Sequence, residues 1–218
     1  MLSQTEENYL KALFHLTSEN ANKHEVGTNE LAATLAVKPA TVNDMLKKLK
    51  EKKLINYEKY GKISLTTVGK KQAVEVVRKH RLWETFLYEK LQFSWDEVHE
   101  VAEQLEHIHS AKLIEQLEKF LGNPEYDPHG DAIPNAKGEF KIQARKTLSE
   151  IAVGKICKLV AVKDNSASFL QYVVQVGLGL SSKIKIISRQ KFDGTMEIEV
   201  NKKKSIVSER FAENIYVI

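Results

Sequence analysis

The first seventy residues alternate between helical patterns of apolar side chains and one strand-like segment. Residues 4–19 carry apolar side chains at helical spacing, and shorter helical patterns follow at residues 28–37 and 39–53. Residues 54–66 alternate apolar and polar side chains around Gly61, which predicts a β-hairpin. Two short helices followed by a hairpin are typical of a winged helix-turn-helix.

The middle of the chain has longer helical patterns. One spans residues 68–93, and a second begins at Ser94, where Glu97 completes a capping box. A third spans residues 110–122 and ends at a glycine. Its apolar stripe has to be buried, so we expect this part of the chain to form a homodimer. The stripe consists of Leu113, Leu117, Phe120 and Leu121.

The last part of the chain changes to strand-like patterns. Residues 123–140 hold three of the four prolines and predict an extended linker loop. Five short apolar segments in about 65 residues then predict a small SH3-like β-barrel. These segments are residues 155–162, 169–176, 183–189, 196–200 and 214–218.

The predicted fold class is mostly α with a small β domain. The three predicted domains are a winged helix DNA-binding domain at residues 1–72, a helical dimerisation and metal-binding domain with the proline-containing loop at residues 73–145, and an SH3-like domain at residues 146–218.

The composition excludes several classes of protein. A content of 42% hydrophobic and 28% charged residues suits a soluble globular protein. No apolar run approaches the roughly 20 residues of a membrane helix, so we expect no membrane partner. Cys157 is the one cysteine, which excludes an internal disulfide and fits the cytoplasm.

Charge is distributed unevenly along the chain. Residues 1–71 carry a net charge of +4, residues 72–140 carry −7 and residues 141–218 carry +7. The acidic middle also contains five of the seven histidines. Acidic runs are usually solvated helix faces, but their coincidence with histidines indicates a place for cations.

The predicted winged helix has a basic face suited to DNA. Residues 38–62 contain eight lysines and three acidic residues, enough to engage phosphates, although a lysine-coated helical domain would have the same composition. Short polar side chains at the start of the second helix are suited to reach base edges in the major groove. The predicted DNA-binding residues are Thr28, Lys38, Pro39, Ala40, Thr41, Asn43, Asp44, Lys47 and Lys48, with Lys59 and Lys62 on the wing.

Six potential metal ligands lie at helical spacing between residues 80 and 107. Carboxylates and imidazoles three and four residues apart share a helix face, and this ligand set suits divalent first-row metals. If the two helices pack antiparallel, they form two sites. One site would contain His80, Glu84 and His99, and the other Glu103, Glu106 and His107. His109 and His129 are expected not to be ligands, since the first lies off this face and the second in the proline loop.

Together these segments resemble the diphtheria toxin repressor family of metal-activated transcription factors, including its manganese-responsive MntR branch. The resemblance spans essentially the whole chain. It is carried by EENYLKAL, PATVNDMLKKL, LINYEKYGKISLT, VRKHRLWETFL, WDEVHEVAEQLEH and NPEYDPHGDAIP. The resemblance implies a winged helix, a helical dimerisation and metal domain, and a C-terminal SH3-like, FeoA-type domain.

The resemblance also assigns roles to individual residues. Glu103, Glu106 and His107 match the family's primary metal site, and His80, Glu84 and His99 match its ancillary site. Glu103 stands where toxin-repressor-like members have Cys, which favours Mn²⁺. Asn8 stands where the family has a Met or Asp ligand, and Lys11 where the manganese branch has a ligand Glu. In toxin-repressor-like members the SH3-like domain supplies further ligands, for which Asp164, Asn165 and Gln171 lie in the right region.

We therefore expect a cytoplasmic homodimeric transcriptional repressor that binds palindromic operator DNA and controls metal homeostasis. Mn²⁺ is the expected corepressor, Fe²⁺ is the alternative, and Zn²⁺ or Co²⁺ would substitute in vitro. Two other functions stay open, a dinuclear metallohydrolase and a metal-independent winged-helix regulator. The chain has no HExxH motif, nucleophile elbow or phosphate loop, so we expect no enzyme.

Overall fold

A computed structural model describes residues 2–18, 24–58, 61–141 and 144–218. The chain forms two compact units. The first unit comprises Met1–His80, Leu105–Ser110 and Pro134–Glu139, and the second comprises Arg81–Gln104, Ala111–Ile133 and Phe140–Ile218. The boundary between them therefore falls inside one long helix, after His80.

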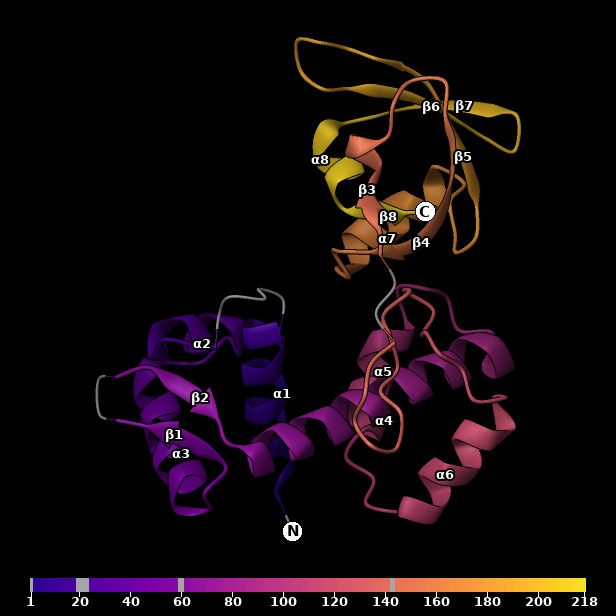
Figure 1. Ribbon diagram of the computed structural model, residues 1–218. Coiled ribbons are helices and arrows are strands. Elements are labelled where there is room, and N and C mark those ends of the chain that lie inside the picture. The colour runs from indigo at the N-terminus through magenta and orange to yellow at the C-terminus, as the bar shows by residue number, and fades with distance from the viewer. Residues whose placement is uncertain (1, 19–23, 59–60, 142–143) are drawn as a thin grey trace. The chain divides into compact units, whose positions relative to one another are not determined.

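The first unit contains a winged helix-turn-helix (Figure 1). Its elements are α1 (Gln4–Ser18), α2 (Thr28–Thr34), α3 (Pro39–Glu51), β1 (Ile55–Tyr57) and β2 (Ile63–Leu65). The two strands pair antiparallel as a hairpin, which confirms the predicted wing. Pro39 occupies the first turn of α3, where its missing N–H has no helical partner. The core of this unit contains the fully buried side chains of Leu10, Leu13, Leu31, Leu46, Leu49 and Ile63.

Three helices follow the wing: α4 (Thr67–Leu91), α5 (Val98–Leu105) and α6 (Ala111–Phe120). The start of α4 lies so close to the residue before β1 that a Cβ on Gly69 would meet the Leu54 carbonyl oxygen at 1.9 Å. Helix α5 begins at Val98, four residues after the predicted capping box at Ser94. The Glu97 carboxylate accepts the Ser94 backbone N–H at 2.8 Å, so the box holds the turn that leads into α5. No helix among the described residues has the length and apolar composition needed to cross a membrane.

The C-terminal part of the second unit is built on a six-stranded antiparallel sheet in the order β3-β8-β4-β5-β6-β7. Its strands are β3 (Lys146–Thr147), β4 (Ile156–Val162), β5 (Lys183–Arg189), β6 (Met196–Val200), β7 (Lys203–Val207) and β8 (Ile215–Val217). Short helical segments η1 (Leu148–Glu150), α7 (Ala167–Gln175) and α8 (Glu209–Glu213) complete it. The helical first part and the small β domain agree with the predicted fold class.

One predicted strand is wrong. Residues 169–176 were expected to form a strand because the segment is rich in β-branched and aromatic side chains, but most of it lies in α7. Leu170 and Val173 are buried three residues apart, which is the spacing of a helix face, and Ser166 is the N-cap residue. Tertiary burial of this face thus overrides the local strand propensity.

Candidate metal centres

Ligand-type side chains gather in two clusters, one in each unit. The cluster in the first unit, here called the α1 centre, joins α1 to residues 105–110 and contains Glu7, Lys11, His80, Glu106 and His107. The cluster in the second unit, here called the loop centre, contains Glu84, Asp127 and His129. Carboxylate, amide and imidazole groups of this kind are the donors that divalent first-row metals use in proteins.

In the α1 centre a carboxylate orients an imidazole. The Nδ1 atom of His107 lies 2.6 Å from Oε2 of Glu7, and both side chains are about 95% buried, with exposures of 6% and 5%. Because an ionised carboxylate only accepts hydrogen bonds, Nδ1 carries the proton and Nε2 keeps its lone pair. That second nitrogen lies 3.8 Å from Oε1 of Glu106. A carboxylate behind a histidine is the usual partner of a metal-binding imidazole.

One oxygen atom of the α1 centre, Oε1 of Glu106, is buried without a hydrogen-bond partner, and so is Oδ1 of Asn8 on α1. Glu106 is fully buried, and a buried acceptor without a donor is costly and therefore rare. A cation between Oε1 of Glu106 and Nε2 of His107, 3.8 Å apart, would satisfy the Glu106 oxygen. The donor set of the α1 centre thus fits a divalent metal.

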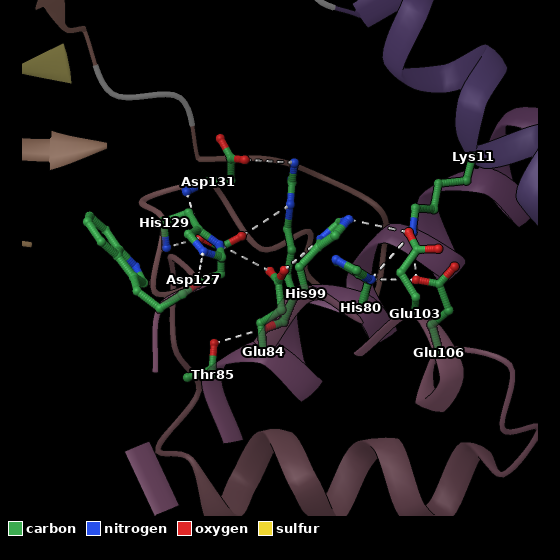
Figure 2. A network of polar contacts seen from close by, with 12 residues as sticks. Lys11, His80, Glu84, Thr85, His99, Glu103, Glu106, Asp127, His129 and Asp131 are labelled. Carbon is green, nitrogen blue, oxygen red and sulfur yellow. Dashed lines mark hydrogen bonds and ion pairs between the residues drawn. The ribbon is translucent and has the colours of Figure 1, made fainter. Parts of the chain in front are cut away.

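The other oxygen of Glu106 is occupied. Its Oε2 atom lies 2.7 Å from Nζ of Lys11 and 2.5 Å from Nδ1 of His80 (Figure 2). Lys11 on α1 and His80 on α4 therefore face one oxygen of this carboxylate, while His107 faces the other. Oε2 of Glu106 therefore has hydrogen-bond partners, whereas Oε1 has none.

The loop centre holds three buried ligand-type side chains close together. One donor atom from each of Glu84, Asp127 and His129 lies within 4.8 Å of the other two (Figure 2). Their residues are 2%, 3% and 0% exposed. Glu84 comes from α4, and the other two come from the loop that was predicted to be an extended linker. That loop instead folds back onto α4 and buries its polar tip.

The hydrogen bond of His129 leaves one ring nitrogen available. Its Nε2 lies 3.0 Å from the Trp95 carbonyl oxygen, which can only accept, so Nε2 carries the proton. Nδ1 is buried, has no hydrogen-bond partner and lies 3.6 Å from Oε2 of Glu84. A backbone carbonyl that fixes the tautomer of a histidine is typical of metal-binding imidazoles. Nδ1 therefore has the geometry of a ligand atom.

Burial and neighbouring charges raise the pKa of two groups in the loop centre. The shift favours the neutral form of Asp127 and the charged form of His129. Burial, Asp131 and Glu84 together raise the pKa of Asp127 to about 7. Burial alone would lower the pKa of His129, but its contact with Glu84 and the charge of Asp127 outweigh it and raise that pKa to about 9. The loop centre therefore contains acidic groups that repel one another, and a bound cation would stabilise their charged forms.

The tip of the loop is held against the β domain. The Val162 backbone N–H donates to the His129 carbonyl oxygen at 3.0 Å, and the His129 ring stacks on Trp95 with 5.7 Å between ring centroids. Gly130 has a φ of +86°, and a Cβ there would lie 1.9 Å from the Val160 carbonyl oxygen. Only glycine fits this approach without strain. The β domain therefore helps to place a metal-ligand candidate.

The remaining predicted ligands, His99 and Glu103, both belong to the second unit. Nδ1 of His99 lies 3.2 Å from Oε1 of Glu84, and its Nε2 lies 3.6 Å from Glu103. The two predicted groupings, His80 with Glu84 and His99, and Glu103 with Glu106 and His107, each include residues of both units and stay predictions. Of the candidates in the β domain, Asp164 accepts the Ser166 backbone N–H and Gln171 donates to Asp96.

Sequence reasoning missed Asp127 and expected His129 not to be a ligand. The signal available was the Asp-x-His spacing in a glycine-containing loop, within the segment DPHGD. His129 was expected not to be a ligand because it lies in the proline-containing loop; in the structure both side chains are buried and close to Glu84.

The predicted DNA-binding residues lie mostly on the exposed face of α3, opposite the buried side chains of Val42, Leu46 and Leu49. Asn43 is half-buried and accepts the Tyr57 hydroxyl at 3.0 Å, and Thr28 is half-buried at the start of α2. Lys59 lies outside the described residues. The exposed members are Lys38, Pro39, Ala40, Thr41, Asp44, Lys47, Lys48 and, on the wing, Lys62.

Comparison with known families covers nearly the whole chain. Residues 1–63 match the family described as "Iron dependent repressor, N-terminal DNA binding domain", residues 66–135 match "Iron dependent repressor, metal binding and dimerisation domain", and residues 146–218 match "FeoA domain". The three matched segments follow the order of the three predicted parts.

Individual proteins give the same picture. A solved structure of a "Manganese-dependent transcriptional repressor complex with manganese" is 31% identical, with a TM-score of 0.83, and the match covers 98% of this chain and 99% of that chain. The iron-dependent repressor IdeR of Mycobacterium leprae is 32% identical over 133 residues, 61% of this chain and 56% of that protein. A "Probable metal transport system membrane protein" of Chlamydia trachomatis is 31% identical over 139 residues, 62% of this chain.

This chain therefore spans about half of IdeR and 30% of the Chlamydia protein. The solved structure, in contrast, matches from end to end. Together with the matches to both repressor domains, it shows that the chain belongs to the iron-dependent repressor family, that is, the diphtheria toxin repressor family of metal-dependent transcriptional regulators.

Proposed function

We propose that this protein is a homodimeric repressor that binds operator DNA when Mn²⁺ or Fe²⁺ occupies its metal centres, and so controls metal homeostasis in the cytoplasm. One observation carries the proposal. Helix α1 contacts both the recognition helix region and the candidate ligands on residues 105–110, within one compact unit.

The link from α1 to the DNA-binding face is polar and close. Glu6 lies 2.7 Å from Nζ of Lys52, the residue that ends α3, and α1 also packs against α2 and β2. The next residue of α1, Glu7, belongs to the α1 centre, and Asn8 follows it. Ordering α1 against residues 105–110 would therefore also hold α3 in place. A dimer that reads a palindrome needs its two recognition helices at a fixed separation.

For the first metal ion we propose the ligands that the sequence predicts, Asn8, Glu103, Glu106 and His107, of which Glu106 and His107 belong to the α1 centre. The two unsatisfied oxygens and the proton on Nδ1 of His107 support this choice. For the second site we propose His80, Glu84 and His99 as the sequence predicts, and add Asp127 and His129 because they share a buried cluster with Glu84. The bound metal would supply positive charge that neutralises the buried carboxylates.

The donors favour hard or borderline divalent ions. They are carboxylate and amide oxygens with imidazole nitrogens, and neither cluster contains the thiol of Cys157, which is buried in the β domain. This composition suits Mn²⁺ first and Fe²⁺ as the alternative, with Zn²⁺ or Co²⁺ able to substitute in vitro. Mn²⁺ as ligand of the structural relative, and iron in the family description, agree with both choices.

Exposed apolar side chains support homodimerisation. On α6 the side chains of Ile114 and Leu117 are buried, but Leu113 is 40% and Phe120 65% exposed. Tyr88 and Leu91 at the end of α4 are exposed in the same unit. Exposed large apolar side chains are typical of protein interfaces, and the matched family domain is described as a dimerisation domain.

The test is DNA binding as a function of metal. A duplex selected by the Mn²⁺-loaded protein from a random pool is titrated with and without Mn²⁺, Fe²⁺, Zn²⁺ and Co²⁺, by fluorescence anisotropy at fixed salt. Metal-dependent binding that is lost in Glu103→Ala and His107→Ala supports the proposal. Equal binding without metal favours a metal-independent regulator, and metal-dependent hydrolysis without DNA affinity favours a metallohydrolase.

A further inference from the structure

Lys11 brings an ammonium group into the α1 centre. Its side chain is 12% exposed, and its Nζ atom lies 2.7 Å from Oε2 of Glu106 and 3.4 Å from Nδ1 of His80 (Figure 2). Glu106 is fully buried. A buried carboxylate is stable only with hydrogen bonds or an opposite charge beside it. Lys11 supplies both, from the helix that carries Asn8.

The ammonium group occupies only one side of the carboxylate. Oε2 faces Lys11 and His80, whereas Oε1 has no hydrogen-bond partner and lies 3.8 Å from Nε2 of His107. The side with the unsatisfied oxygen is the side where the donor set fits a metal. The Lys11 side already contains a cation at hydrogen-bond distance, which a second metal ion would have to displace.

We propose that Lys11 acts as a built-in second cation of the α1 centre. The centre then takes one divalent ion per chain, on the Oε1 side of Glu106, and the charge of Lys11 sets how tightly that ion binds. A like charge near the ion lowers its affinity, since two positive charges repel strongly at the short distances of a partly dehydrated site. This proposal rests on the proposed metal binding at Glu106 and His107.

The same contact has a consequence for the protein without metal. Lys11 joins α1 to Glu106 when no ion is bound, so part of the attachment of α1 is independent of metal. A protein built this way would order α1 in two steps, first by the ammonium and then by the metal. Lys11 is therefore a residue that sets metal stoichiometry and affinity rather than a ligand.

The experiment compares three proteins in a His129→Ala background, which removes the loop centre. They carry the native Lys11, Lys11→Met, which keeps the length but loses the charge, and Lys11→Arg, which keeps the charge. Lys204→Met serves as a control, because Lys204 also pairs with a glutamate, Glu197, but is 57% exposed and lies in the β domain. Mn²⁺ binding is measured by isothermal titration and by the electron paramagnetic resonance signal of unbound Mn²⁺.

We expect one Mn²⁺ per chain with native Lys11 and with Lys11→Arg. Lys11→Met should bind Mn²⁺ at least about tenfold more tightly. Its metal-free melting temperature should fall by roughly 5 °C or more, because it leaves a buried carboxylate without its cation. Lys204→Met should leave Mn²⁺ affinity unchanged.

Two results would overturn the role of Lys11 while leaving metal binding intact. One is an unchanged affinity in Lys11→Met together with a loss of binding in His107→Ala. The other is binding of two Mn²⁺ ions at the α1 centre with native Lys11. If no variant binds Mn²⁺ in this background, the proposed metal function of the α1 centre fails as well, and the proposal falls with it.

Discussion

Asp127→Asn is expected to change stability and metal binding in opposite directions. The carboxylate is 3% exposed, and Oδ1 accepts the backbone N–H groups of His129 at 2.8 Å and Asp131 at 2.9 Å. Asparagine can keep these two hydrogen bonds through its own oxygen. The substitution removes only a buried negative charge, so we expect the loop to keep its conformation.

The size of the effect follows from the pKa. Burial, Asp131 and Glu84 raise the pKa of Asp127 from 3.8 to about 7, so the charged form is disfavoured in the folded state. A difference of about three pKa units corresponds to about 4 kcal/mol at most. This pKa already includes the favourable charges of Arg81, 3.6 Å away, and of His129. We therefore expect a net gain of about 1–3 kcal/mol in the metal-free protein near pH 8.

The pH dependence has a definite sign. An acid whose pKa is raised on folding stabilises the folded state only while it is protonated. The wild type should therefore lose stability relative to Asp127→Asn as the pH rises from about 4 to about 7, and the difference should stay constant above. Urea unfolding of the metal-free proteins, followed by circular dichroism at several pH values, measures this difference.

The Asp127→Asn substitution should weaken metal binding. Asparagine lacks the charge of a carboxylate, so Mn²⁺ affinity at the loop centre should fall by about 10–100-fold or more. A metal-free Asp127→Asn protein that is less stable than the wild type at pH 8, or one that binds Mn²⁺ as tightly, would refute the view that Asp127 is a strained ligand kept for metal binding.

Three further predictions concern the loop and the dimer. Gly130→Ala should destabilise the protein by about 2–4 kcal/mol, because its Cβ would clash with the Val160 carbonyl oxygen. Gly122→Ala, with a φ of +77° and nothing within 4 Å of its Cβ, should cost only about 1 kcal/mol. Comparable losses for the two variants in thermal unfolding would contradict the clash. Metal binding at the loop centre should release about one proton per ion at pH 8 and fewer above pH 9, since His129 has a pKa of about 9 and must lose its proton to bind through Nδ1; calorimetry in buffers of different ionisation heat measures the release, and a release that does not vary with pH would be inconsistent with this role. Phe120→Glu should convert the dimer to a monomer in sedimentation equilibrium, whereas Phe192→Glu, at a fully exposed position of the β domain, should not; a dimeric Phe120→Glu protein would rule out this face.

Much of the fold could be predicted because its signals are local. The helical spacing of α1, α3, α4 and α6 and the alternation around Gly61 are properties of short segments, and the structure has these elements where the pattern places them. The strand prediction for residues 169–176 failed because local propensity favoured a strand while the buried side chains of α7 share a helix face.

The metal centres show where sequence reasoning ends. Helical spacing was enough to select Glu84 and His99, which lie on α4 and α5, and also Glu106 and His107, which lie in the turn directly after α5. It could not find the contribution of Asp127 and His129, since their burial depends on a loop that folds back and is held by the Val162 backbone and the close approach at Gly130. Nor could it show that Glu7 orients His107, a contact between residues 100 positions apart.

The central claim is that metal binding at the α1 centre and DNA binding by α3 are coupled through α1. Coupling between two sites is reciprocal, so DNA must raise the affinity for metal by the same factor by which metal raises the affinity for DNA. The most direct measurement is therefore the Mn²⁺ affinity of the His129→Ala protein with and without a saturating amount of its selected duplex. We predict binding about 5–150-fold tighter in the presence of DNA, and equal affinities would contradict the account.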